Sequence, residues 1–223
     1  MDEIPGKIGP DGPAPPPSDA GSSIPFEDTS QPFISRLLET IKLAFADPAK
    51  LFSNMPSADI GAPVLYGLIT GTIAAVFTIL WQMMFGGLLT IAENAPLDEF
   101  AIGTGFMFVW LIFSPVFIVV GLFIQSAIYH VMLLIVGDGQ RGFAVTLRSV
   151  CYGSTPQLLG VVPICGSLIG GVWTLVLVIM AAIYGHRTDA WRVVLAYFLP
   201  MIVCCCLAFW LASMFGLLGV FSR

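Results

Sequence analysis

The hydrophobic residues of this chain fall into long blocks with only short polar connections between them. Charged residues are absent from four windows, 60–90, 101–137, 149–185 and 193–222. Each window is longer than the roughly 20 residues that cross a bilayer as a helix. The pattern therefore predicts an integral membrane protein with at least four spans.

The third window contains helix-breaking residues, so one or two passes fit it. These residues are Pro156, Pro163 and Gly166. With one pass, the basic loop 186–192 would face away from Lys42 and Lys50, whereas two passes place all of them on the cytoplasmic side, as the positive-inside rule favours. A re-entrant hairpin over 143–184 is the alternative to two full spans. The five predicted spans are 63–85, 104–136, 143–162, 167–184 and 193–217.

Two segments precede this five-span domain of residues 57–223. Residues 1–31 are rich in Pro, Gly, Ser and Asp, a composition that predicts a disordered acidic tail. Residues 32–56 predict an amphipathic helix, which lies either along the inner membrane surface or on the bundle. Its apolar positions recur at helical spacing: Ile34, Leu37, Leu38, Ile41, Ala44 and Phe45.

The predicted fold class is therefore all-α, a polytopic transmembrane bundle of five helices preceded by a disordered tail and an interfacial amphipathic helix. The connection after the first span contains acidic residues and no Lys or Arg, which places it outside. We expect a multi-pass protein of the cell membrane, the cytoplasmic membrane in a prokaryote, with the N-terminus cytoplasmic and the C-terminus outside. Arg148 is expected to extend from the third span toward the inner interface.

Composition narrows the function. The chain is 57% hydrophobic and 10% charged, and its formal net charge of −5 excludes a basic nucleic-acid-binding surface. Three of the five cysteines are consecutive, Cys204 to Cys206, with no spacing that suits a metal or a disulfide. No hydrolase, metalloprotease or phosphate-loop motif occurs. We therefore predict no catalytic, cofactor-binding or metal site and no enzymatic activity.

Polar residues within the spans form the only candidate site. His130, next to Tyr129, lies about 10 Å from the inner end of the second span, near the depth expected for Tyr152, Ser154 and Gln157. The five side chains form either a small polar cavity or hydrogen bonds that fix helix packing.

The spans contain no Asp, Glu or buried Lys, which argues against an ion-coupled transporter. The predicted function is a non-enzymatic membrane scaffold or adaptor that recruits partners at the cytoplasmic face. The alternative is a passive transporter, channel or lipid-handling protein. The expected partners are the lipid bilayer and an unidentified protein, which includes a second copy of the chain in a homo-oligomer.

Several segments resemble one known family. They are residues 45–52 (FADPAKLF), residues 148–156 (RSVCYGSTP), residues 162–166 (VPICG) and Trp173. Over about residues 33–217 the chain resembles the prokaryotic branch of the Yip-domain family, and this resemblance implies a five-helix membrane bundle. Eukaryotic members bind Rab-type GTPases, but the Asp-Leu-Tyr-Gly-Pro element typical of that branch is absent here, so that partner is not expected.

Overall fold

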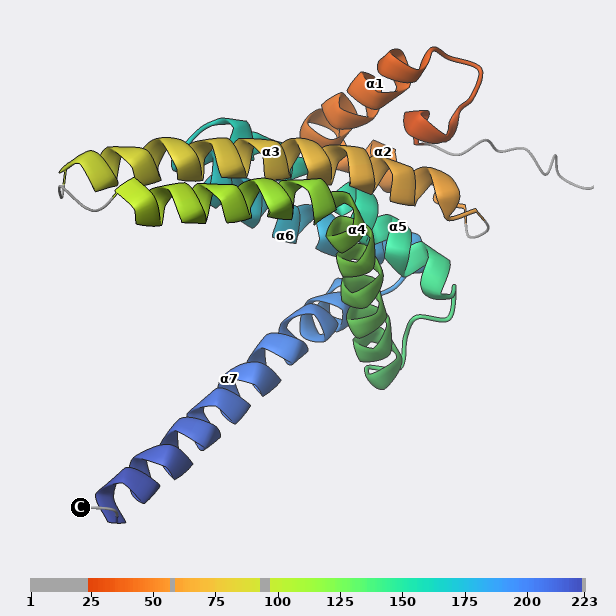
Figure 1. The fold of residues 1–223 in the computed structure, drawn as a ribbon. Coiled ribbons are helices and arrows are strands. Elements are labelled where there is room, and N and C mark those ends of the chain that lie inside the picture. Colours follow the sequence, from red (N-terminus) through yellow and green to blue (C-terminus); the bar gives the residue numbers. More distant parts are fainter. Residues whose placement is uncertain (1–23, 57–58, 93–96, 222–223) are drawn as a thin grey trace, which may run out of the picture.

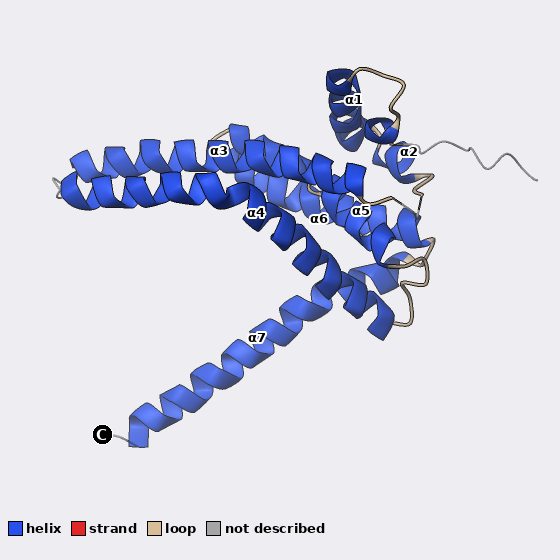
Figure 2. Cartoon of the chain, turned by 45° about the vertical axis from the view of Figure 1, so that its right-hand side comes forward, coloured by secondary structure: helices blue, strands red, loops and turns tan. Residues whose placement is uncertain are grey.

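All regular structure is helical in the described part of the chain. The computed structural model describes residues 24–56, 59–92 and 97–221, and Figure 2 shows only helices and loops among them. The α-helices are α1 (Phe33–Ala46), α2 (Pro48–Phe52), α3 (Gly61–Ala92), α4 (Leu97–Ile135), α5 (Phe143–Gly153), α6 (Cys165–His186) and α7 (Ala190–Phe221). Two 3-10 segments, η1 (Pro25–Glu27) and η2 (Thr155–Val161), complete the order. The predicted all-α class is confirmed.

Four of these helices, α3, α4, α6 and α7, are long and apolar enough to cross a membrane. Many of their large apolar side chains are exposed, as is expected where lipid surrounds the helices. The predicted third span, 143–162, instead holds the 11-residue helix α5 followed by η2. Four of the five predicted spans are thus confirmed as helices that could cross a membrane. A crossing by the segment α5–η2 stays a prediction.

The segment α5–η2 runs antiparallel to α6. Gly153 packs against Val178, and Gly170 packs against Pro156. Pro156 lacks the N–H that a continuing α-helix needs, which explains the change to a 3-10 segment. The indole Nε1 of Trp81 donates a hydrogen bond of 3.0 Å to the Gly160 carbonyl, so α3 satisfies one backbone group of the broken segment.

The turn between η2 and α6 is tight. The N–H of Cys165 donates to the Pro163 carbonyl at 2.7 Å, and Ile164 between them has a φ of 64°. A Cβ on Gly166 would overlap the carbonyl oxygen of Leu159, so only glycine fits there. Pro156, Pro163 and Gly166 therefore shape this hairpin, as their residue types suggested.

Helices α3 and α4 form an antiparallel pair, in which Gly67 packs against Leu122 and Gly71 against Ile118. Figure 1 shows that the C-terminal part of α4 bends away from α3. Pro115 lies inside α4 and cannot donate to the Leu111 carbonyl; the Ser114 hydroxyl donates to that oxygen instead, at 2.8 Å. The predicted kink is present.

Helix α7 leaves the other helices soon after it begins (Figure 1). Val193 and Ala196 are buried against Leu133 and Ala182. Residues 201–210 are all exposed. Up to residue 210, therefore, the packing of α7 on this chain comes from the part before Met201.

The N-terminal region corrects one expectation. Residues 24–31 were assigned to the disordered tail, but Ile24 and Phe26 are buried, and η1 lies against α1 and α3. The burial of these two apolar side chains fixes η1 on the bundle, although the residues around them are polar. Residues 1–23 lie outside the described residues.

Helix α1 forms within the predicted segment 32–56 and packs on the bundle. Thr40 and Ala44 are buried, whereas Ile34 and Leu38 are 68% and 59% exposed. One face of α1 therefore meets the protein, and a second apolar face is open. Contact of that open face with the membrane surface stays a prediction.

Gly170→Ala should destabilise the protein by about 2 kcal/mol, because the added Cβ would lie 2.5 Å from the Pro156 carbonyl oxygen. Gly171→Ala is the matched control, since nothing lies within 4 Å of its added Cβ. Thermal unfolding of the purified protein in detergent would compare them. Equal midpoints for the two variants would contradict this packing of η2 on α6.

Candidate functional site

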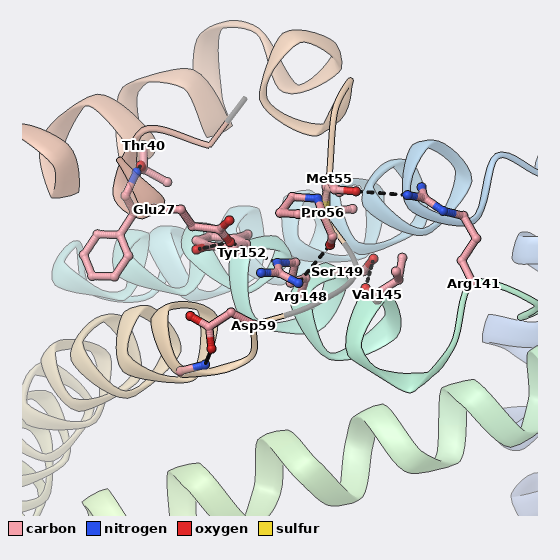
Figure 3. Close-up of polar contacts among 12 residues, drawn as sticks. Glu27, Thr40, Met55, Pro56, Asp59, Arg141, Val145, Arg148, Ser149 and Tyr152 are labelled. Atoms are coloured by element: carbon pink, nitrogen blue, oxygen red, sulfur yellow. Dashed lines mark hydrogen bonds and ion pairs between the residues drawn. The ribbon is translucent and has the colours of Figure 1, made fainter. Parts of the chain in front are cut away.

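The described part of the chain contains a buried ion pair between segments far apart in sequence. Arg148, on α5, is 1% exposed, and its Nε lies 3.0 Å from Oε1 of Glu27 on η1. Its Nη1 donates to the Pro56 carbonyl at 2.8 Å. Tyr152, one helical turn after Arg148, donates its hydroxyl to the same Glu27 oxygen at 3.0 Å. Figure 3 shows these side chains pointing toward one another.

Aromatic rings enclose this ion pair. The ring of Tyr66 on α3 lies between Phe26 and Tyr152, with centroid distances of 5.1 Å and 4.9 Å. The Tyr66 hydroxyl is 2.9 Å from the Thr155 hydroxyl oxygen, so its polar end is also satisfied. The side chains of Arg148 and Glu27 are only 2% and 9% exposed, and this burial strengthens the attraction between them.

Helix α1 holds the backbone of η1. The N–H of Phe26 donates to the Thr40 hydroxyl at 2.9 Å, and the Phe26 carbonyl accepts from Nη1 of Arg36 at 3.0 Å. Arg36 also lies over the Phe26 ring, 5.7 Å from its centroid. Both main-chain hydrogen-bonding groups of Phe26 are thus bound by side chains.

Arg148 was expected to extend to the inner interface. Its side chain is instead buried and paired with Glu27, and its depth relative to the membrane stays a prediction. The partner was missed because Glu27 belongs to a polar stretch assigned to the disordered tail. The available signal was the pair Ile24 and Phe26 immediately before it, the one place in that stretch where apolar residues alternate.

A second set of polar contacts closes the same end of the bundle. Arg141, in the connection from α4 to α5, donates to the carbonyls of Met55, at 3.1 Å, and Gly185. Partial burial and the neighbouring Arg187 lower the pKa of Arg141, although a guanidinium stays charged. Asp138 accepts from the Thr188 hydroxyl and from the Gly139 N–H. Hydrogen bonds therefore link the connection between α4 and α5 to the connection between α2 and α3 and to the one between α6 and α7.

The structure divides the predicted polar cluster. Nδ1 of His130 lies 3.0 Å from the Thr146 hydroxyl oxygen, which is also 3.0 Å from Nε2 of His186. Tyr129 instead stacks on Tyr197 of α7, with centroids 4.6 Å apart. His130 thus joins α4, α5 and α6 through Thr146 and His186, which were not part of the predicted cluster.

The other three predicted residues lie elsewhere. Tyr152 bonds Glu27, and Ser154 donates to the Cys151 carbonyl of its own helix at 2.8 Å. Gln157 is exposed and lines two hollows beside η2, one of which Ser154 also lines. Most of these residues form hydrogen bonds that fix packing, and Gln157 is the one exposed residue among the five.

The chemistry of the site is that of an anchor. The Glu27 carboxylate, the Arg148 guanidinium and the Tyr152 hydroxyl bind one another, so the ion pair holds η1 on α5. Among the described residues, no group of three His, Cys, Asp or Glu side chains could hold a metal ion.

Glu27→Gln should lower the stability by about 3 kcal/mol, because Arg148 would stay buried without its counter-charge. Asp28→Asn is the control, since Asp28 is exposed and its side chain bonds only Ser30. Thermal unfolding in detergent measures both. An unfolding midpoint for Glu27→Gln as high as that of Asp28→Asn would contradict the anchoring role.

Comparison with known proteins identifies the family. Neither the curated proteins nor the solved structures that were compared give a match to this chain. The family model described as the Yip1 domain matches residues 42–212, which include α5, η2 and the whole of α6. The family prediction is confirmed, and assignment to its prokaryotic branch stays a prediction. This integral membrane protein belongs to the Yip1 domain family.

Proposed function

We propose that this protein is a non-enzymatic membrane scaffold, which recruits partner proteins at the cytoplasmic face of the membrane. The observation that carries the proposal is the buried Glu27–Arg148 ion pair. It fixes η1 to the bundle, so the chain before Ile24 starts from a defined point. A partner bound by that segment would be recruited to this end of the bundle.

The anchored end also supports the proposed orientation. Arg141, Arg148 and Arg192 all bond main-chain carbonyls in the connections at this end. Cations gather on the cytoplasmic side of membrane proteins. The N-terminus and the anchor then face the cytoplasm, α5–η2 forms the third of five spans, and the C-terminus lies outside.

The arrangement of polar groups favours a scaffold over an enzyme. Catalytic groups need access to a substrate, but Arg148 and Tyr152 are buried and already paired with Glu27. Their chemistry is used to position a segment of the chain.

Partner recovery after crosslinking tests the scaffold. Deletion of residues 2–55, combined with Arg148→Met so that no charge is left unpaired, should abolish recovery of proteins enriched by the intact chain. Deletion of residues 2–23 alone separates the contribution of the tail from that of the anchored helices. Asp28→Asn is the control, and quantitative mass spectrometry is the readout. An unchanged set of partners, at equal membrane abundance, would contradict the scaffold.

The orientation predicts that Cys165 reacts with a membrane-impermeant maleimide from outside, because it is exposed at the first residue of α6. The background variant carries Ala at residues 151 and 204–206, and Asn94→Cys in the predicted outer connection is the positive control. Reaction at position 94 without reaction at Cys165 would support a re-entrant hairpin over 143–184 instead of two full spans.

One observation favours a second candidate function, a passive pathway for small neutral solutes or lipid. A hollow between α3, η2 and α6 is lined by small or polar residues, among them Ala75, Thr78, Gln157 and Ser167. A second hollow, between α3, α4 and η2, shares Gly71 and Gln157 with it. The Gln157 side chain forms no hydrogen bond with any other described residue. Uncharged polar surface of this kind suits a neutral solute.

If this pathway exists, purified protein in liposomes should move glycerol or labelled phospholipid, and Gln157→Leu should slow the transfer severalfold. Ile102→Val, at a position that is 75% exposed on α4, is the control and should have no effect. Transfer rates equal to those of protein-free liposomes for all solutes would exclude this candidate and leave the scaffold.

A further inference from the structure

The residues Ile24 to Glu27, called the strap below, are bound as a short peptide ligand would be. Ile24 and Phe26 are 0% and 2% exposed, and the Glu27 carboxylate meets a guanidinium and a phenol. The strap site consists of Thr40 and Arg36 of α1, which bind the Phe26 backbone, and of Tyr66, Arg148 and Tyr152, which contact its side chains. Main-chain capture together with side-chain recognition is the usual basis of peptide binding.

An exposed connection joins the strap to α1. Residues 28–32 are all exposed, and the Asp28 side chain bonds only Ser30 within the same connection. The strap therefore acts as a tethered ligand, held at a high effective concentration beside its site. A free peptide competes with it poorly unless the strap is weakened or removed.

The buried charge decides which ligands can replace the strap. Without Glu27, Arg148 would keep only the Pro56 carbonyl, and Tyr152 would lose its acceptor. A buried guanidinium without a counter-charge is strongly destabilising. A replacing segment must therefore bring its own carboxylate, next to an aromatic residue that fills the position of Phe26.

We propose that the strap site is a recognition site for a partner protein, and that the strap is its internal competitor. The partner segment has an aliphatic residue, an aromatic residue two positions later and an acidic residue directly after that. This inference rests on the proposed scaffold function and names the kind of partner that the scaffold takes. Binding of such a segment releases the strap and the tail before it.

Fluorescence anisotropy tests the proposal with the protein in nanodiscs. The probe is a labelled peptide of residues 22–30 (SSIPFEDTS), and the receptor is the chain with residues 2–29 deleted. The deletion variant should bind the peptide at least about tenfold more tightly than the intact chain does, because the tethered strap competes only in the latter. A peptide with Leu-Pro-Tyr-Glu in place of residues 24–27 should bind within about tenfold of the probe.

Variant peptides serve as matched controls. Glu27→Gln and Phe26→Ala in the peptide should each weaken binding at least about tenfold, whereas Asp28→Asn should not change it. Arg148→Gln in the receptor should remove the preference for Glu over Gln. If the deletion variant does not fold, the intact chain with Phe26→Ala replaces it, since a weakened strap should admit the probe.

Three results would overturn the proposal. The first is no binding by a folded receptor, and the second is equal binding of the probe peptide and its Glu27→Gln variant. The third is strap-dependent association of two differently tagged intact chains, which would make a second copy the occupant. The scaffold proposal is tested separately, by the crosslinking experiment. Partners that bind the tail or the loops do not require the strap site, so the scaffold can hold even if the strap site binds no partner.

Discussion

A buried guanidinium requires a counter-charge, and most of the arrangement at one end of this protein follows from that requirement. Arg148 lies on α5 and is buried, so a carboxylate must reach it. Glu27 supplies that carboxylate from a point more than a hundred residues earlier in the chain. Residues that a composition argument assigns to a tail are thereby held against the membrane domain, and η1 in turn packs on α1.

A second constraint acts on the broken segment η2. Backbone groups outside an α-helix must find partners, since lipid offers none. The hairpin meets this requirement through Trp81, which donates to Gly160, and through glycines on α6 that let the two backbones approach. Within η2, Thr155, Pro156 and Gly160 are buried, whereas Gln157 and Val161 are exposed, and Gln157 lines a hollow.

The sequence was informative where a single segment determines its own structure. Apolar blocks identified the four long helices, Pro115 the bend, and residues 156–166 the hairpin. It was less informative where two distant segments meet. Depth along a helix placed His130 near Tyr152, but rotation about the helix axes directs them to different partners, Thr146 and Glu27. The strap was missed because its order arises from contacts and not from its own composition.

Helix α7 packs on the rest of the chain near its start, and residues 201–210 are exposed along their whole length. Those residues gain free energy by leaving water for the bilayer, not by packing on neighbouring helices. Unfolding of the bundle and insertion of this helix are then separate processes. A polar substitution among residues 201–210 would alter the insertion of the ribosome-bound chain into the membrane. The melting temperature of the inserted protein would stay the same.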